Sequence, residues 1–161
     1  MSKVKHTLKP VYDKNSKTLI LGSMPSVKSR EIMKYYGHPQ NRFWHILEII
    51  YEEDSTEWQN FILKHNLALW DVIASCDIDK SSDSSIKNVE VNKIDELIKN
   101  SSITNIVVLG KTAYNLYQKY VYPITNIEGI YLPSPSSANA SKSLEELVEK
   151  YKIIKKVTNE K

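Results

Sequence analysis

The sequence predicts an α/β fold, a three-layer αβα sandwich with a central four-stranded parallel sheet. Short apolar runs alternate along the chain with segments whose apolar residues recur at helical spacing, which is typical of a parallel sheet covered on both faces. The apolar runs are continuous, as in strands that are buried on both sides. A length of 161 residues suits one domain with a real core, and we expect residues 1–161 to form it.

Four strands are predicted, in residues 17–22, 67–70, 103–109 and 127–132. The first contains three consecutive branched aliphatic residues and ends at Gly22. The second is followed by Asp71. The third is the strongest apolar run of the chain and is followed by Gly110. Polar or flexible residues therefore stand at the carboxyl end of each of these three strands.

Helices are predicted between these strands and after the last one. Residues 29–36 have Ser29 as the candidate N-cap, and Asn41 and Asn92 have the same position before two later helices. Residues 81–85 are polar and are expected to form a loop. The inner faces and spans of the later helices are as follows: Phe43, Trp44, Leu47 and Ile50; Trp58, Phe61 and Ile62; Ile94, Leu97 and Ile98; residues 111–121; and residues 141–157 with Leu144, Leu147, Val148, Tyr151 and Ile154.

Composition excludes several classes of protein. The net charge of +3 indicates at most a weak preference for polyanions. The longest apolar run, residues 106–109, is too short to span a bilayer, and the N-terminus lacks the features of a signal peptide, so we expect a cytoplasmic protein with no membrane partner. Cys76 is the only cysteine and is expected to be a small buried residue. The histidines have no metal-ligand spacing with carboxylates, so neither a metal nor a cofactor is expected.

The unusual residues gather where such a fold binds its ligands, beyond the carboxyl ends of the strands. Four segments meet there: residues 22–26, Asp71, Gly110 with Lys111, and the small-residue loop of residues 133–140. The first of these suits an anion site or a tight turn, and the last suits contact with a phosphodiester or a plain surface loop. Asp71 is expected either to accept a hydrogen bond from a ligand N–H, or to cap a helix or pair with a basic residue.

Residues 35–44, with the sequence Tyr-Tyr-Gly-His-Pro-Gln-Asn-Arg-Phe-Trp, follow the first of these loops. Their aromatic residues have neither strand nor helix spacing, and glycine and proline bend the segment. Flat rings beside hydrogen-bonding side chains suit a planar polar ligand such as a nucleobase. The alternative is an aromatic loop packed on the core, in which His38 is a hydrogen-bonded turn residue.

Taken together, these segments resemble the uracil-DNA glycosylase superfamily, and within it the hypoxanthine-DNA glycosylase branch (DNA-deoxyinosine glycosylase, family 6). That branch has Gly-Ser-Met-Pro-Gly after its first strand, then Tyr-Tyr-Ala-His-Pro-Arg-Asn-Ala-Phe-Trp, Leu-Trp-Asp-Val, and Leu-Pro-Ser-Thr-Ser-Pro-Ala-Asn-Ala. The matching segments here are residues 22–26, 35–44, 69–72 and 132–140. Four motifs in register span nearly the whole chain. Departures from the pattern include Ser26, Leu109, Pro135 and Ser137.

The resemblance implies a uracil-DNA-glycosylase-like fold and a monofunctional DNA glycosylase that hydrolyses the N-glycosidic bond of a flipped deaminated base, hypoxanthine first and uracil second. The protein would act in base excision repair on DNA that contains such a base, as a monomer without cofactor or metal. The resemblance assigns catalysis to Asn41, which would position water, and the departing base would be stabilised by His38 or by backbone amides. Two sets of contacts follow: Gly22, Ser23, Met24, Phe43 and Asp71 with the base, and Pro25, Ser26, Lys111, Ser134, Ser136, Ser137 and Asn139 with DNA.

Two alternatives stay open. The first is a catalytically silent nucleic-acid or nucleotide-binding module on the same fold. The second is a bifunctional glycosylase that forms a Schiff base, for which Lys111 is the nearest lysine.

Overall fold

The computed structural model describes residues 2–78 and 86–159, so the loop predicted at residues 81–85 lies outside the described residues. The centre of the molecule is a four-stranded sheet in which every pairing is parallel. Its strand order is β3 (Leu67–Asp71), β2 (Thr18–Gly22), β6 (Asn105–Leu109) and β7 (Gly129–Leu132). The predicted sheet is therefore confirmed, with each strand within a few residues of its predicted range.

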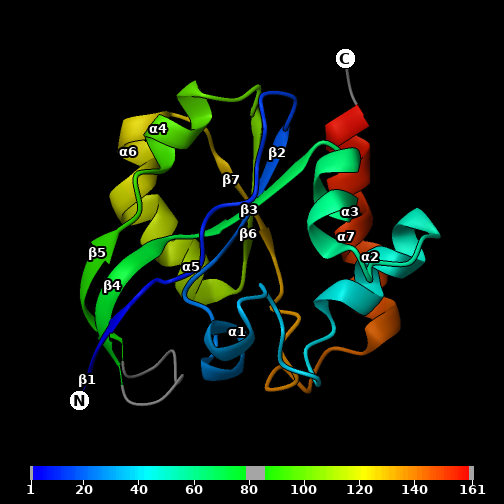
Figure 1. The fold of residues 1–161 in the computed structure, drawn as a ribbon, viewed down its shortest axis with the longest axis horizontal. Helices are drawn as coiled ribbons and strands as arrows, with labels where there is room; N and C mark the ends of the chain where they lie inside the picture. The colour runs from blue at the N-terminus through cyan, green and yellow to red at the C-terminus, as the bar shows by residue number, and fades with distance from the viewer. Residues whose placement is uncertain (1, 79–85, 160–161) are drawn as a thin grey trace.

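Helices cover both faces of this sheet (Figure 1). One face carries α2 (Phe43–Tyr51), α3 (Trp58–Lys64) and α7 (Leu144–Asn159). The other carries α4 (Ile94–Lys99), α5 (Lys111–Leu116), the π-helical turn η2 (Tyr117–Val121) and α6 (Tyr122–Thr125). Alternate residues of one strand serve the two cores, since Ile20 packs on the first face and Leu19 and Leu21 on the second. The three-layer prediction is confirmed.

A second sheet was not predicted. It is antiparallel, with the order β1 (Ser2–Lys5), β4 (Ile73–Ile78) and β5 (Lys87–Val91). Only Val72 separates β3 from β4, and its amide donates to the carbonyl oxygen of Gly22 at 2.9 Å before the chain enters the second sheet. β1 and β5 are short and rich in lysine and polar residues, which is how exposed edge strands avoid further pairing and why they give no apolar signal. Asp71 thus lies at the junction of the two sheets.

Two of the predicted helix caps, Ser29 and Asn92, do not cap a helix with their side chains in the structure. The first helix, α1 (Val27–Ile32), is capped by Ser26, whose hydroxyl accepts from the amide of Ser29. Ser29 itself is buried, and its hydroxyl accepts from the amide of Gly37 at 2.9 Å. Asn92 caps no helix with its side chain, because its amide donates to the carbonyl oxygens of Asp71 at 2.8 Å and Ile73 at 3.1 Å. Both differences tie loops together near the ends of β2 and β3.

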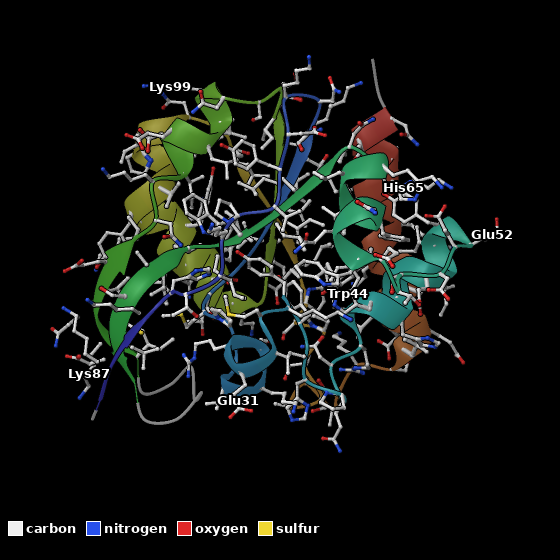
Figure 2. All side chains as sticks on the ribbon, viewed as in Figure 1. Glu31, Trp44, Glu52, His65, Lys87 and Lys99 are labelled. Atoms are coloured by element: carbon white, nitrogen blue, oxygen red, sulfur yellow. The ribbon has the colours of Figure 1, made fainter. Side chains whose placement is uncertain are left out.

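Trp44 belongs to the core, as predicted. Figure 2 shows it inside the molecule, whereas Glu52 and Lys99 extend from the surface. The Trp44 side chain is buried, and its indole N–H donates to the carbonyl oxygen of Tyr35 at 2.8 Å. Cys76 is completely buried, which confirms that prediction too. None of the helices in the described ranges is both long and apolar enough to cross a bilayer.

Candidate functional site

A cavity of about 640 Å³ opens at the carboxyl ends of the parallel strands. The four segments that the sequence placed at this edge all line it, together with the start of the aromatic segment. Its volume is within the range of small-molecule and cofactor sites. The lining residues are Gly22, Ser23, Met24, Pro25, Ser26, Ser29, Tyr35, Tyr36, Asn41, Asp71, Leu109, Gly110, Lys111, Tyr131, Ser134, Pro135, Ser136, Ala138 and Asn139.

Asp71 is a buried carboxylate on the cavity wall, 3% exposed. The Nε2 atom of His6 lies 2.8 Å from its Oδ2 atom, and the His6 side chain is equally buried. Of the two roles that the sequence left open for Asp71, pairing with a basic residue is therefore present. The pairing does not exclude contact with a ligand. His6 contacts only Oδ2, and Asp71 still lines the cavity. No pattern in the sequence connects His6 to this site, since it lies in a basic, polar N-terminal run.

Gly22 leaves room for this carboxylate. A Cβ atom at position 22 would lie 2.6 Å from Oδ1 of Asp71 and 3.1 Å from the hydroxyl of Tyr36. Real Cβ atoms do not approach other atoms so closely, so any side chain here would displace one of these two groups. Gly22 is therefore required by close approach of side chains to the end of β2.

Asn41 lines the cavity from the loop before α2. Its Oδ1 atom accepts a hydrogen bond from the amide of Phe43 at 2.9 Å, but the N-cap residue of α2 is Arg42 and not Asn41 as predicted. A carbonyl oxygen has two lone pairs, and this bond uses one of them. The oxygen keeps capacity to accept one more hydrogen bond, and the backbone bond fixes its direction.

Phe43, which was predicted to contact a base, does not line the cavity in this structure. Phe43 is completely buried, and the ring of Tyr36 stacks on it with centroids 4.0 Å apart and planes at 25°. Tyr36 lines the cavity instead. Among residues 2–78 and 86–159 the buried Tyr36 hydroxyl has no hydrogen-bond partner. Burial, with the Asp71 charge as a smaller cause, raises its pKa well above the ordinary value.

His38 also lies away from the cavity lining. It is exposed in the turn before Asn41, and its Nδ1 atom accepts from the amide of Gln40 at 3.1 Å. The geometry matches the turn-residue alternative rather than a group beside a bound base. The catalytic role of His38 stays a prediction, and in this structure the side chain belongs to the turn and not to the cavity lining.

Arg42 holds the loop of residues 133–142 through hydrogen bonds, a role that was not predicted from the sequence. The Arg42 guanidinium donates to the carbonyl oxygens of Lys142 at 2.6 Å, Ser136 at 2.8 Å and Asn139 at 3.1 Å. Its Nε–H and its backbone amide both donate to the carbonyl of Pro135, at 3.3 and 3.1 Å. The motif quoted for the hypoxanthine branch has alanine at this position, and that difference was the available signal.

The residues predicted to contact DNA fall into two groups. Pro25, Ser26, Lys111, Ser134, Ser136 and Asn139 line the cavity, whereas Ser137 is exposed beyond its lining. The Asn139 side chain is directed into its own loop, where Nδ2 donates to the carbonyl of Ser134 at 3.1 Å. The backbone shape of this loop is thus set from within and by Arg42. In the described ranges, no group of three histidine, cysteine or carboxylate side chains is arranged to hold a metal ion.

The fold and the cavity at the strand ends can now be compared with those of known protein families. The family model of the uracil DNA glycosylase superfamily matches residues 9–158, and the chain belongs to that superfamily. A curated relative from Methanosarcina acetivorans, named hypoxanthine DNA glycosylase, is 31% identical over 141 residues, which cover 84% of this chain and 89% of the relative. A second protein of that name, from Methanosarcina barkeri, is 43% identical over 89 residues, 52% of this chain and 56% of the relative.

The fold is also similar to that of a solved structure. A solution NMR structure of a Methanosarcina acetivorans protein, described there as a candidate uracil DNA glycosylase, superposes with a TM-score of 0.80 at 28% identity. The match covers 97% of this chain and 99% of that one. The resemblance inferred from the four motifs is therefore confirmed at the level of family and fold.

Proposed function

We propose that the protein is a monofunctional DNA glycosylase that hydrolyses the N-glycosidic bond of a deaminated base, hypoxanthine first and uracil second. The observation that carries the proposal is that the Asn41 side chain and the buried Asp71 carboxylate line the same cavity. Family membership and the names of the Methanosarcina relatives support the same reaction. A base inside a duplex cannot reach such a cavity, so the target nucleotide would be flipped out of the stack.

The reaction asks for a positioned water rather than a strong nucleophile. As the glycosidic bond breaks, the sugar gains oxocarbenium character, and water can then attack C1′. Asn41 would accept a hydrogen bond from this water through the free lone pair of its Oδ1 atom. Because the bond from the Phe43 amide fixes that oxygen, the water would be oriented before the bond breaks.

The departing base would be recognised and stabilised by the opposite wall. Asp71 would accept a hydrogen bond from its ring N–H, and the ring of Tyr36, which lines the cavity, would lie against the base. Amides of the loop at residues 22–26 would serve the negative charge that develops on the base. His38 is not needed for this step.

The DNA strand would be gripped by the loop at residues 133–140 and by Lys111. Small residues let a phosphodiester approach the backbone closely, and the Arg42 bonds hold that backbone in one shape. A loop that is already ordered binds with little entropic loss. Lys111 is exposed at the cavity rim, where its charge can pair with a phosphate.

The test is a panel of oligonucleotides that contain inosine, uracil, xanthine or a mismatch, treated with alkali after incubation to reveal abasic sites. We expect release of hypoxanthine at the highest rate. Asn41→Ala should lower the single-turnover rate by about 100-fold or more while lesion-DNA affinity changes little. Full activity of Asn41→Ala would contradict the assignment. Absence of base release from every lesion would favour the silent binding module.

The Schiff-base alternative has a separate test, because Lys111 lines the cavity. A covalent adduct with DNA after borohydride treatment would indicate a lysine nucleophile. We expect no adduct in the wild type and unchanged base release in Lys111→Gln at saturating enzyme.

A further inference from the structure

We propose that His6 is a positioning residue for base selection: it holds Asp71 so that one carboxylate oxygen stays directed at the cavity, as acceptor for the ring N–H that deamination creates. The proposal rests on the proposed function and extends it to a residue near the N-terminus, 65 positions before Asp71. In adenine N1 is an unprotonated acceptor, whereas hypoxanthine has N1–H. Cytosine N3 and uracil N3–H differ in the same way. A fixed acceptor therefore separates deaminated bases from their parents.

The fold brings His6 to the site through the second sheet. The His6 residue directly follows β1, and its amide donates to the carbonyl of Ala74 in β4 at 2.7 Å. Its ring lies beside Tyr35, with centroids 6.0 Å apart, and its side chain is 3% exposed. Nothing in the parallel sheet requires this arrangement. The antiparallel sheet thus delivers an imidazole to the back of the cavity wall.

The two oxygens of Asp71 have different surroundings. Oδ2 receives the bond from His6 at 2.8 Å, while Oδ1 lies over Gly22, which lines the cavity. The backbone of Asp71 is held as well, since Asn92 donates to its carbonyl oxygen at 2.8 Å. The carboxylate is thus fixed at its backbone and at one oxygen. Because Asp71 and Gly22 both line the cavity, Oδ1 is the oxygen that we assign to the ligand.

Burial makes the imidazole necessary. A carboxylate almost removed from solvent is costly unless a donor satisfies it, and His6 supplies that donor. Without the imidazole the carboxyl group would rotate toward another donor. A rotated group removes the acceptor at the cavity, which weakens the distinction between a deaminated base and its parent.

The experiment compares two substrates that differ at the purine edge: 2′-deoxyinosine, with N1–H, and 2′-deoxynebularine, which has neither N1–H nor the 6-oxygen. Single-turnover release rates are measured for the wild type, His6→Leu and His6→Gln. Leucine keeps volume without a donor, and glutamine restores an N–H at similar reach. We expect the inosine-to-nebularine rate ratio to fall about 10-fold or more in His6→Leu and to recover in large part in His6→Gln.

A purely structural role predicts something else. It would lower both rates together and leave their ratio unchanged, and that result would overturn the proposal. Asp71→Asn provides a second check through a double-mutant cycle, in which His6→Leu should add little to the loss of ratio already caused by Asp71→Asn. Additive effects would overturn the proposal as well.

A second experiment tests the role of His6 independently of the glycosylase assignment, because it measures binding of the free bases and not cleavage. The affinities of hypoxanthine and of unsubstituted purine are compared by NMR titration in the wild type and in His6→Leu, with thermal melts to confirm folding. A preference for hypoxanthine that is lost in His6→Leu supports the role of His6 even if no lesion is cleaved. The same preference in both proteins, or in neither, contradicts it.

Discussion

The Nη1 atom of Arg42 lies 2.6 Å from the carbonyl oxygen of Lys142, a hydrogen bond between residues 100 positions apart. Further bonds from the same guanidinium reach Ser136 and Asn139. Arg42 directly follows Asn41, so the proposed catalytic segment and the proposed DNA-gripping loop are joined through one side chain. A guanidinium suits this task, because its donors are arranged in a rigid fork.

Arg42→Ala should therefore affect DNA binding through the loop. Loss of several charge-assisted bonds to backbone carbonyls should lower the free energy of unfolding by about 2–4 kcal/mol and lesion-DNA affinity by about 10-fold or more. Arg42→Lys should recover less than half of either, since one ammonium cannot replace the fork. Lys99→Ala removes an equal charge on exposed α4 and is the control for affinity measured by fluorescence anisotropy. Equal losses in Arg42→Ala and Lys99→Ala would contradict the loop argument.

Gly22→Ala should remove base recognition at a smaller cost in stability. The new Cβ would lie 2.6 Å from Oδ1 of Asp71, so the carboxylate must move away from the cavity. We expect a loss of stability of about 1–3 kcal/mol and of base release by about 100-fold or more. Adding Asp71→Ser to Gly22→Ala should restore much of the stability, measured by urea unfolding, without restoring activity. Normal base release by Gly22→Ala would contradict the close approach.

The sequence predicted the parallel sheet well because its strands are buried on both faces and therefore apolar throughout. Ile20 and Leu21 illustrate this, since both are completely buried although they face opposite cores. It predicted the second sheet poorly, because β1 and β5 are short, polar edge strands with little apolar surface to bury. The cavity-lining loops could be located for a related reason: they follow strands whose ends the sequence marks with glycine, aspartate or proline.

Individual roles within the site were harder to predict, because they depend on which ring covers which. Residues 36 and 43 are both aromatic, and only their stacking reveals that Tyr36 faces the cavity and Phe43 lies beneath it. His6 and Arg42 act over 65 and 94 residues of separation, respectively, toward Asp71 and Ser136. Contacts of that kind leave no local pattern, so the tertiary fold alone reveals them.

Tyr36→Phe separates the two aromatic residues experimentally. The Tyr36 hydroxyl is buried without a partner in the described part of the chain, so its removal should leave the free energy of unfolding unchanged or raise it by up to about 1 kcal/mol. Phe43→Leu should lower it by about 1–2 kcal/mol, because Phe43 is completely buried. Thermal melts measure both. A base-release rate that falls in Tyr36→Phe despite intact stability would indicate that the hydroxyl donates to the bound base, whereas loss of stability would contradict the absence of a partner.

Buried phenols should make the protein sensitive to alkali. Burial raises the pKa of Tyr35, Tyr36 and Tyr151 above the ordinary value near 10. Above about pH 10 the unfolded chain therefore loses these protons while the folded protein retains them. The folded state then binds more protons than the unfolded state, so its stability is fully present below pH 10 and falls as the pH rises further. We expect no tyrosine-linked decrease of the melting temperature between pH 7 and 9, and a steep decrease above pH 10.

Tyr36→Phe tests this linkage without removing a hydrogen bond known in the described structure. The contribution of each retained proton to the decline approaches about 1.4 kcal/mol per pH unit well above pH 10, so between pH 10 and 11 the variant's free energy of unfolding should fall by about 1 kcal/mol less than that of the wild type. Tyr120→Phe, at an exposed position on η2, should leave the slope unchanged. Absorbance at 295 nm reports tyrosine ionisation in the same samples. An identical slope in Tyr36→Phe and the wild type would show that the Tyr36 hydroxyl ionises in the folded protein and would contradict its burial.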